Sequence, residues 1–370
     1  ILLGLVGSEM CIRDSHVTYE VDGPDIPKIA HEIAIGQSIG NPNIRSEIEN
    51  SDNIKEMAAE IVSIDGNEVV ISFPNKAFNW PNINQLMCII MGGHTDIMGV
   101  DRCRVLDISI EVPVKKPVKG MSGLKKRTGA EERPVFGAIV KPKSGLTKDQ
   151  LTEIVKQMMD GGADFIKEDE IMADNSYLPL HERVEAIETL KTTCDWKGFY
   201  AYCINADPLD LIANLKIIDY HTGLKENVMG GVHINFWSGL GAYTSARDMN
   251  IPCHYQRSGI RILTDPSNKY SIAWPVLAKL GCMAGVDSMH VGMLGGYYPE
   301  GESEEETLTA IDICKQHNTI PSLSCGMNPV LAQEIRERIG NDFMASIGGW
   351  LHTGETIYEK VYEMRKSLDS

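Results

Sequence analysis

The sequence predicts a (β/α)8 barrel preceded by a smaller α+β domain of the ferredoxin-like kind. The chain has 370 residues, which is more than one hydrophobic core usually serves. Beyond Arg133, short apolar segments alternate with segments of helical periodicity, as they do in folds built on a parallel sheet. Eight such pairs fit within about 240 residues, the usual extent of a barrel.

The first domain is expected over residues 16–132 and mixes short strands with amphipathic helices. We expect strands at 19–21, 58–64, 68–73 and 104–112, and helices at 26–36 and 83–91. The pair Asp65-Gly66 favours a tight hairpin turn between the second and third strands. Residues 115–132 are rich in Lys and Gly and have few large apolar side chains, so we interpret them as a solvated linker.

The barrel is expected over residues 133–370. Its eight strands are predicted at 135–140, 164–168, 198–204, 231–236, 251–255, 286–291, 319–324 and 343–347. A last helix at 357–367 would close the ring. The sequence contains no internal repeat or low-complexity segment that competes with this interpretation.

The composition excludes several classes of protein. The net charge of −16 would repel nucleic acid and anionic membrane surfaces, and the one dense basic stretch, 115–127, has no interleaved aromatic residue. No apolar run reaches the roughly 18 to 20 residues that a membrane-spanning helix needs. Nine cysteines without a Cys-x-x-Cys pair suit a reducing compartment. We therefore expect a cytoplasmic protein with no nucleic-acid or membrane partner.

The opening segment, residues 1–15, has an apolar start but no basic region and no initiator Met, so it fits a signal peptide poorly. It resembles translated adaptor sequence of the kind found at the ends of environmental sequence fragments. We expect this segment, with Cys11, to be non-native and set it outside the fold.

Polar residues or glycines stand at the end of every predicted barrel strand, which is where barrel enzymes build their sites. In chain order they include Lys141, Lys143, Lys167, Asp169, Glu170, Asn205, His233, Asn235, His254, Gln256, Arg257, Ser288, His290, Ser324, Gly326, Gly348 and Gly349. Any one of them alone is more often a satisfied structural residue than a catalyst. Eight strand ends of this kind in register are instead typical of an active site.

The segment 161–170, Gly-Gly-Ala-Asp-Phe-Ile-Lys-Glu-Asp-Glu, is the most informative one. Side chains alternate along a strand, so Lys167 and Asp169 share a face while Glu168 points away. Asp169 and Glu170 offer the hard oxygen ligands that Mg²⁺ prefers. Two roles are open for Lys167. It is either the protonated partner in an ion pair with these carboxylates, or it takes up CO2 and becomes a carbamate that supplies a third oxygen ligand.

This segment resembles the Gly-Gly-x-Asp-Phe-x-Lys-x-Asp-Glu motif of the RuBisCO large-chain family, whose lysine is carbamylated and whose last two residues bind Mg²⁺. Residues 137–146 resemble the family's first-strand motif, in which the first lysine moves protons at the substrate carbons. The similarity continues in order through almost everything after residue 15. It implies that Lys167, Asp169 and Glu170 bind Mg²⁺, with CO2 held as the lysine carbamate, and that Lys141 and Lys167 are catalytic.

Resemblance and residue types together indicate two phosphate-binding regions. Glycines after the seventh and eighth strands let backbone N–H groups approach an anion, although simple tight turns would also explain them. Arg257 suits phosphate as a bidentate guanidinium, and a salt bridge at a helix end is its alternative. The residues implied to bind substrate or phosphate are Lys143, Arg257, His290, Ser324, Gly326, Gly348 and Gly349.

Several positions depart from the carboxylases of this family. The lysine of their mobile loop corresponds to Tyr297, whose neutral phenol cannot supply positive charge beside added CO2. A catalytic histidine corresponds to Gln256, whose amide cannot exchange protons near neutral pH, and His254 is the candidate to replace it. The Glu and Trp of their substrate-closing loop correspond to Gly36 and Pro42. These losses argue against carboxylation of ribulose bisphosphate.

The resemblance therefore implies a RuBisCO-like protein of the form IV type. Such a protein is a Mg²⁺-dependent isomerase, enolase or decarboxylase that forms an enediolate on a phosphorylated ketose or sugar acid. The segments Lys141-Pro142 and Asn235-Phe-Trp237 look more like the isomerase and decarboxylase branches. Two alternatives stay open: a genuine ribulose-1,5-bisphosphate carboxylase with an altered loop, and a non-catalytic sugar-phosphate-binding protein. The family also implies a homodimer at least.

Overall fold

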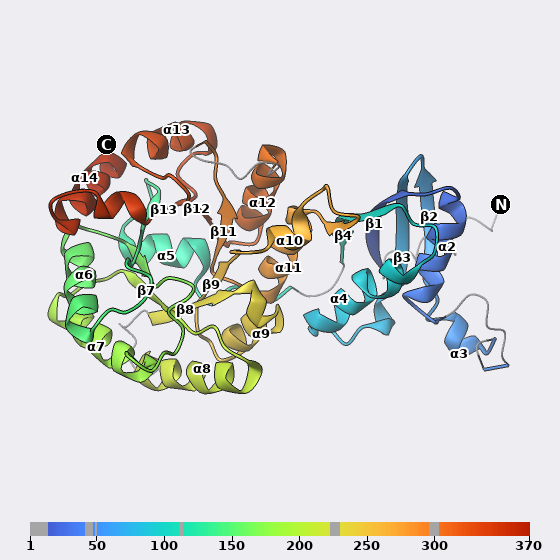
Figure 1. Cartoon of the computed structure of the whole chain (residues 1–370), viewed down its shortest axis with the longest axis horizontal. Coiled ribbons are helices and arrows are strands. Elements are labelled where there is room, and N and C mark those ends of the chain that lie inside the picture. The colour runs from blue at the N-terminus through green and yellow to red at the C-terminus, as the bar shows by residue number, and fades with distance from the viewer. Residues whose placement is uncertain (1–13, 41–46, 49, 111–113, 223–229, 296–302) are drawn as a thin grey trace. The chain divides into compact units, whose positions relative to one another are not determined.

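The computed structural model describes residues 14–40, 47, 48, 50–110, 114–222, 230–295 and 303–370. Tyr297 and Pro42, like Cys11, lie outside the described residues. The chain divides into two compact units, Ile1–Val114 with Ile260–Leu280 and Lys115–Gly259 with Gly281–Ser370 (Figure 1). We call them the small unit and the barrel unit and describe each by itself. No helix in the described part of the chain is both long enough and apolar enough to cross a membrane.

The small unit is built on an antiparallel sheet with the strand order β4-β1-β3-β2. Its elements are β1 (Asp14–Asp22), α2 (Ile26–Gly36), α3 (Asp52–Lys55), β2 (Glu60–Asp65), β3 (Glu68–Pro74), α4 (Ile83–Met91) and β4 (Arg102–Ser109), with the 3-10 turns η1 (Asn75–Ala77) and η2 (Gly93–Asp96). Apart from the single turn α3, the order of strands and helices is βαββαβ, which confirms the predicted ferredoxin-like domain.

The core of the small unit lies on one face of this sheet. Val17, Tyr19 and Val21 of β1 are fully buried, whereas the residues between them are only partly buried. Both covering helices begin at a residue whose side chain caps a backbone N–H, Asp25 for α2 and Asn82 for α4. The apolar stripes of the two helices are buried through Ile29, Ala30, Ile33, Ala34, Ile83, Leu86 and Ile90.

Two segments belong to the small sheet although the sequence analysis did not place them there. Strand β10 (Tyr270–Ile272) comes from the sequence between the fifth and sixth barrel strands and pairs in parallel with β4. Arg104 of β4 donates a hydrogen bond from Nη1 to Ser271 Oγ at 3.0 Å. The second segment is the start of β1, which includes residues 14 and 15, and there Ser15 Oγ donates to Asn75 Oδ1 at 2.6 Å.

The barrel unit contains a closed sheet of eight parallel strands, as predicted. The strands are β5 (Val135–Ile139), β6 (Phe165–Lys167), β7 (Phe199–Cys203), β8 (Gly230–Asn235), β9 (Cys253–Gln256), β11 (Ser288–Gly292), β12 (Ile320–Leu323) and β13 (Met344–Ile347). They follow the chain order around the ring, and β13 closes it by pairing with β5. All eight carboxyl ends therefore meet at one rim.

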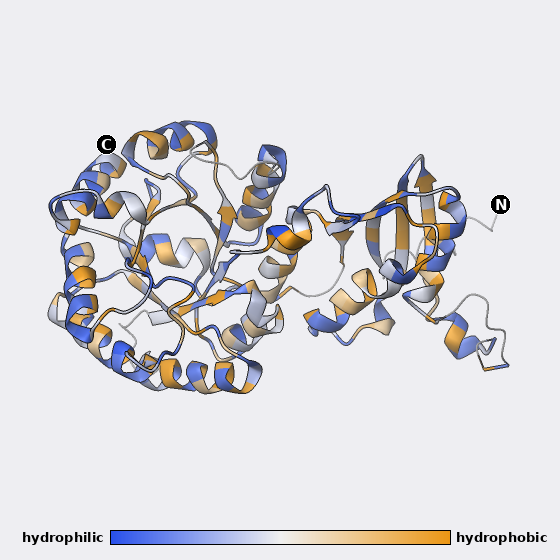
Figure 2. Cartoon of the chain, in the orientation of Figure 1, coloured by the Kyte–Doolittle hydropathy of each residue, from blue (hydrophilic) through white to orange (hydrophobic). Residues whose placement is uncertain are grey.

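Helices surround the ring (Figure 1). They are α6 (Lys148–Asp160), α7 (Leu180–Thr193), α8 (Pro208–Thr222), α9 (Gly241–Asp248), α12 (Glu304–Gln316), α13 (Pro329–Ile339) and α14 (Ile357–Asp369), with the turns η3 (Phe236–Ser238) and η4 (Gly349–His352). The short α10 (Arg261–Thr264) belongs to the small unit, and α11 (Trp274–Ala284) begins in the small unit and ends in the barrel unit. Most of these helices carry hydrophilic and hydrophobic residues side by side in Figure 2, because one stripe of each packs on the strands.

The expectation of a solvated linker over 115–132 is wrong. Helix α5 (Gly120–Thr128) occupies this stretch, and its Leu124 packs in a buried cluster with Val135, Phe165 and Phe199 from the starts of three barrel strands. Lys125 is also buried, and its amine reaches Asp342 Oδ1 at 2.7 Å. Apolar side chains at the amino ends of the strands would be exposed to water without α5. Their burial stabilises a helix in a segment whose composition does not predict one.

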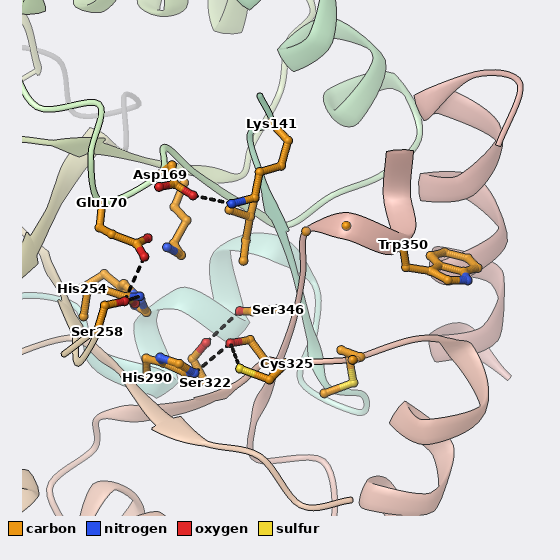
Figure 3. A pocket seen from close by; sticks show the side chains of 18 residues that line it. Lys141, Asp169, Glu170, His254, Ser258, His290, Ser322, Cys325, Ser346 and Trp350 are labelled. Atoms are coloured by element: carbon orange, nitrogen blue, oxygen red, sulfur yellow. Dashed lines mark hydrogen bonds and ion pairs between the residues drawn. The ribbon is translucent and has the colours of Figure 1, made fainter. Parts of the chain in front are cut away.

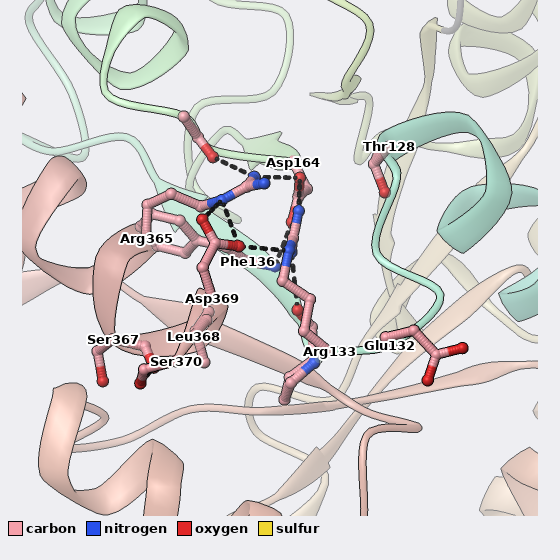
Figure 4. A network of polar contacts seen from close by, with 12 residues as sticks. Thr128, Glu132, Arg133, Phe136, Asp164, Arg365, Ser367, Leu368, Asp369 and Ser370 are labelled. Carbon is pink, nitrogen blue, oxygen red and sulfur yellow. Dashed lines mark hydrogen bonds and ion pairs between the residues drawn. The ribbon is translucent and has the colours of Figure 1, made fainter.

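A polar network joins the first two strands to the last helix (Figure 4). Asp164 accepts from the Arg133 guanidinium, from Arg365 Nη1 at 3.0 Å and from the backbone N–H of Phe136 at 2.9 Å. Arg133 Nε also lies 3.0 Å from Asp369 Oδ1. The network ties α14 to the start of the ring and thereby helps to close it.

Candidate active site

A cavity of about 450 Å³ opens at the carboxyl ends of the barrel strands, and all of its lining residues belong to the barrel unit (Figure 3). The lining consists of Ile139, Lys141, Lys167, Asp169, Glu170, His254, Gln256, Ser258, His290, Ser322, Ser324, Cys325, Gly326, Met327, Ser346, Gly348, Gly349 and Trp350. Six of the eight strands contribute to it directly or through the residues that follow them. The closed sheet thus brings together side chains that are far apart in the sequence.

Ten of the twelve candidate site residues line this cavity. They are Lys141, Lys167, Asp169, Glu170, His254, His290, Ser324, Gly326, Gly348 and Gly349. The other two, Lys143 and Arg257, are not in its lining. The side chain of Lys143 is 53% exposed, with its amine 4.0 Å from Asp169 Oδ1. Arg257 is buried beside β11, where a Cβ added to Gly292 would lie 3.0 Å from its Nη2.

Asp169 lies between two amines. Its Oδ2 forms an ion pair with Lys141, which follows β5, and its Oδ1 faces Lys143. Asp169 itself is only 1% exposed, so this carboxylate is satisfied mainly by the two lysines. Lys141 also packs over the glycine turn after β13, since a Cβ added to Gly348 would lie 3.4 Å from Lys141 Cε. The lysine therefore connects the acidic wall of the cavity to its glycine-rich wall.

Lys167 is the last residue of β6 and is buried in the wall of the cavity. Burial lowers the pKa of its amine, and the charges of Glu170 and Asp169 oppose this effect only in part. The ion pairs of Asp169 go to Lys141 and Lys143 and not to Lys167. Addition to CO2 requires the neutral amine, which burial favours and the neighbouring carboxylates oppose. Both alternatives for Lys167 therefore stay open.

Glu168 points away from the cavity, as the strand alternation predicts. It is fully buried and forms an ion pair with Arg183 of α7, Nε to Oε1 at 2.9 Å. Tyr200 and the backbone N–H of Cys203 also donate to its carboxylate, at 3.2 and 2.8 Å. Arg183 donates in turn to carbonyl oxygens of the loop that follows β6, those of Ala173 and Leu178. The pair holds the segment that carries Asp169 and Glu170.

Glu170 takes part in a chain of hydrogen bonds along the cavity wall. Ser258 Oγ donates to Glu170 Oε1 at 2.9 Å, and Gln256 Nε2 donates to Ser258 Oγ at 2.7 Å. Burial raises the pKa of the Glu170 carboxyl, but the charge of Lys167 and hydrogen bonds, among them that from Ser258, outweigh burial and lower it. Glu170 is therefore ionised at neutral pH.

Two histidines of the cavity are held neutral. Burial, and after it the charge of Lys167, lowers the pKa of His254 well below its usual value. The pKa of His290 is also lowered well below its usual value, by burial and then by the charges of Arg257 and Lys167. His254 Nδ1 lies 2.8 Å from Ser288 Oγ, and His290 Nε2 lies 2.7 Å from Ser324 Oγ. Each ring is thus oriented by a serine and adds no charge to the cavity.

The turns after β12 and β13 form the glycine-rich wall. Gly326 has φ +90°, a conformation that only glycine adopts without strain. Cys325, directly before it, is held at φ +84° with its side chain in the cavity lining. Gly348 and Gly349 follow β13, and 3-10 turn η4 starts at Gly349. Backbone N–H groups of such turns can approach an anion closely.

Sequence reasoning missed several lining residues, namely Ser258, Ser322, Cys325, Met327, Ser346 and Trp350. Ser322 and Ser346 lie within strands and hydrogen-bond to each other across the barrel interior at 2.7 Å. Their position could have been found from strand alternation, because they are two residues before the polar ends of β12 and β13. Ser258 had no such signal, since it stands in a loop whose path the sequence does not show.

The donor set fits a hard divalent cation. Within the residues that the structure describes, no cluster of three His, Cys, Asp or Glu side chains is placed to hold a metal ion. Asp169 and Glu170 supply two oxygen ligands, and Mg²⁺ commonly completes its coordination with water or substrate oxygens. Lys167 as a carbamate would add a further protein ligand from the same strand end.

The closed ring and its strand-end cavity define the class: a (β/α)8-barrel protein with its candidate site where barrel enzymes carry theirs. The sequence model of the family described as ribulose bisphosphate carboxylase large chain, catalytic domain, matches residues 120–355. The chain belongs to the RuBisCO large-chain family.

Relatives within this family differ in their activities. The chain is 26% identical over 314 residues to a ribulose bisphosphate carboxylase from Archaeoglobus fulgidus, covering 77% of this chain and 70% of the relative. It is 31% identical over 256 residues to a 3-oxo-isoapionate-4-phosphate decarboxylase from Rhizobium rhizogenes, covering 66% and 59%. The structure superposes on that of a RuBisCO-like protein from Burkholderia fungorum with a TM-score of 0.81 at 21% identity, covering 96% and 94%.

Proposed function

We propose that the protein is a RuBisCO-like, Mg²⁺-dependent enzyme that forms an enediolate on a phosphorylated ketose or sugar acid, as an isomerase, enolase or decarboxylase. The observation that carries the proposal is the single cavity that contains Lys141, Lys167, Asp169 and Glu170 together with the glycine-rich wall. A purely structural barrel would have no need of two lysines and two carboxylates, largely buried, at one rim. The proposal includes a cytoplasmic homodimer, as family resemblance implies.

Asp169, Glu170 and Lys167 as its CO2 adduct are the residues that would hold the metal. Mg²⁺ in such a site polarises a carbonyl group and stabilises negative charge that develops on it. The glycine-rich wall would bind a phosphate through backbone N–H donors. Ser324 and His290, whose Oγ and Nε2 lie 2.7 Å apart, would contact the substrate side by side. Lys143 and Arg257, which lie outside the cavity lining, are proposed as further phosphate ligands. These contacts would fix the substrate with its reacting carbons near Lys141.

Lys141 would move the proton at the substrate carbon. Its ion pair with Asp169 holds the amine at the cavity wall, beside the turn at Gly348. His254 would be a second proton-transfer group, because burial keeps its imidazole neutral and its Nδ1 is oriented by Ser288. Gln256 in place of a histidine cannot share this work, since an amide neither gains nor loses a proton near neutral pH.

Decarboxylation is the branch that the relatives favour, because a relative at 31% identity is named a decarboxylase of a phosphorylated sugar acid. Carboxylation of ribulose 1,5-bisphosphate is the second candidate, favoured by the carboxylase relative from Archaeoglobus fulgidus. Tyr297 bears on the choice between the two reactions, because carboxylases of the family carry a lysine at this position. Tyr297 lies outside the residues that the structure describes.

The test is a screen of ketose phosphates and phosphorylated sugar acids for turnover that requires both Mg²⁺ and bicarbonate, with Lys167→Ala as the blank. Exchange of a substrate C–H proton with deuterated water, measured by NMR, detects enediolate formation without knowledge of the product. We expect metal-dependent exchange for at least one compound. Formation of phosphoglycerate from ribulose 1,5-bisphosphate would instead establish the carboxylase. Absence of exchange and turnover with all compounds would leave a binding protein.

A further inference from the structure

Glu170 is held by hydrogen bonds at both its backbone and its side chain. Its carbonyl oxygen accepts from Asn205 Nδ2 at 2.7 Å and from the Cys203 thiol at 3.4 Å. Its carboxylate accepts from Ser258 Oγ at 2.9 Å (Figure 3). Glu170 itself follows β6, and these donors come from the ends of β7 and from the loop after β9. Asn205 is not among the residues that line the cavity, so it acts on the cavity through Glu170.

The amide of Asn205 is fixed in one orientation. An amide oxygen only accepts hydrogen bonds, and an amide NH2 group only donates them. The backbone N–H of Asn235 donates to Asn205 Oδ1 at 2.6 Å, which turns Nδ2 toward the Glu170 carbonyl. The Asn235 side chain is anchored in turn. Its Nδ2 donates to the carbonyl oxygen of Ser258 at 3.2 Å, and its Oδ1 accepts from the N–H of Trp237 at 3.0 Å.

These contacts close into a ring, which we call the Glu170 circuit. It runs from the Glu170 carbonyl through Asn205, Asn235 and Ser258 and returns to the Glu170 carboxylate. A single hydrogen bond lets a side chain pivot, whereas a closed circuit restricts the carboxylate relative to its own backbone. The position of the Glu170 carboxylate is therefore set by the protein and not by the cation that it binds.

We propose that Asn205 is a positioning residue that makes the metal site selective for Mg²⁺ over Ca²⁺, because it holds Glu170 in the Glu170 circuit. The inference rests on the proposed function, which assigns Glu170 as a metal ligand, and adds the cause of selectivity. Mg²⁺ demands nearly octahedral geometry with oxygens at about 2.0 to 2.1 Å, whereas Ca²⁺ accepts flexible arrangements at about 2.3 to 2.6 Å. A loosened ligand therefore penalises Mg²⁺ more than Ca²⁺.

The Glu170 circuit acts through geometry and not through charge. Asn205, Asn235 and Ser258 are neutral, and the two cations carry the same charge. An effect of charge would change the affinities for both cations in the same direction and to a similar extent. The ratio of the Kd of Ca²⁺ to the Kd of Mg²⁺ therefore reports how well the ligand is positioned.

The test measures both Kd values by calorimetry, with the full chain in bicarbonate. Asn205→Leu keeps the approximate shape of the side chain and removes both hydrogen bonds of the amide. Loss of a residue that orients a metal ligand typically weakens binding about tenfold or more, which we expect for Mg²⁺. For Ca²⁺ we expect less than about threefold, so the ratio should fall at least about threefold.

A second variant, Asn205→Asp, keeps the acceptor for the Asn235 N–H. It replaces the donor to the Glu170 carbonyl by an oxygen, which repels that carbonyl. The added charge attracts both cations, so the affinities can rise, but the ratio of the two Kd values should fall as it does in Asn205→Leu. Thermal unfolding without metal shows that each variant is folded and measures any loss of stability separately.

Asn175 provides the matched control. It lies in the loop after β6, where its Nδ2 donates to the Met172 carbonyl at 3.0 Å and its Oδ1 accepts from the Leu178 N–H at 2.7 Å. Asn175→Leu removes the same kinds of hydrogen bond outside the Glu170 circuit. It should leave the ratio within about twofold of the wild-type value.

The outcomes separate this inference from the proposed function. An unchanged ratio in the Asn205 variants overturns the inference and leaves the proposed function standing. An equal fall in Asn175→Leu also overturns it, because general loosening of the loop would then explain the result. A wild type that binds Ca²⁺ as tightly as Mg²⁺ has no selectivity for Asn205 to cause. If the wild type binds neither cation in bicarbonate, the metal site of the proposed function fails, and this inference fails with it.

Discussion

Arg183 and Glu168 form an ion pair that is completely buried, Nε 2.9 Å from Oε1, directly behind the strand end that presents Lys167 and Asp169. Neither side chain is accessible to solvent, and each has further hydrogen bonds to backbone groups. Glu168 stands at one of the three variable positions of the sequence motif, yet this residue connects the motif to α7. The chemistry of the cavity therefore depends on a pair that does not touch it.

Loss of one member of this pair should destabilise the protein strongly. Arg183→Met leaves the Glu168 charge buried without its partner, and such changes cost about 3 to 5 kcal/mol. Urea unfolding measures the difference. The matched control is Arg338→Met on the exposed pair Arg338–Glu304, where 2.6 Å separates Nη2 from Oε1 and where we expect about 0 to 1 kcal/mol. Equal effects of the two substitutions would contradict the role of burial.

Bicarbonate-dependent metal binding should require Lys167. We expect Mg²⁺ to bind the wild type more tightly with bicarbonate than without it, because the carbamate supplies an oxygen ligand. Lys167→Arg keeps a cation but cannot form a carbamate, so the bicarbonate effect should disappear. Carbon-13 NMR with labelled bicarbonate should show a carbamate signal in the wild type and none in Lys167→Arg. Lys197→Arg, on an exposed lysine paired with Asp195, is the control, and a carbamate signal that survives in Lys167→Arg would assign it to another lysine.

Helix α5 should contribute to the stability of the barrel. Leu124→Ala removes a side chain that is 5% exposed and packed against the strand starts, and we expect a loss of about 2 to 5 kcal/mol. The same substitution at Leu209 of α8, which is 87% exposed, should change stability by less than about 0.5 kcal/mol. Thermal and urea unfolding provide the comparison. A linker-like α5 would show no difference between the two variants.

The small unit should lose stability in acid through His94. Burial lowers the pKa of this imidazole, and Gln37 Nε2, 3.3 Å from Nδ1, is placed to donate to its neutral form. The unfolded chain takes up the proton first, near the usual histidine pKa of about 6.5, so stability declines as pH falls below that value. His94→Gln should reduce the slope of the unfolding free energy between about pH 7 and 5. An unchanged slope would show that His94 does not titrate between the two states.

Much of the fold follows from local patterns. Helices α2 and α4 have the predicted bounds, 26–36 and 83–91, because an apolar stripe and an Asx cap mark them in the sequence. The predicted ends of the barrel strands lie within two residues of the observed ends, because buried parallel strands are short apolar runs that the sequence shows. Strand β10 was not predicted. It has three residues and exists only through its pairing with β4, which is distant in the sequence.

The sequence by itself determined which residues could meet. A parallel barrel gathers the carboxyl ends of its strands, so the order of the strands was enough to bring Lys141, Lys167, Asp169 and Glu170 to one rim. Only the tertiary structure decided how these side chains face each other. Asp169 forms its ion pair with Lys141, and Lys167 is buried and forms no ion pair with Asp169. The fold also brings Ser258, a loop residue, between Gln256 and Glu170. Strand patterns are local, whereas burial and hydrogen-bond direction depend on contacts that only the folded chain makes.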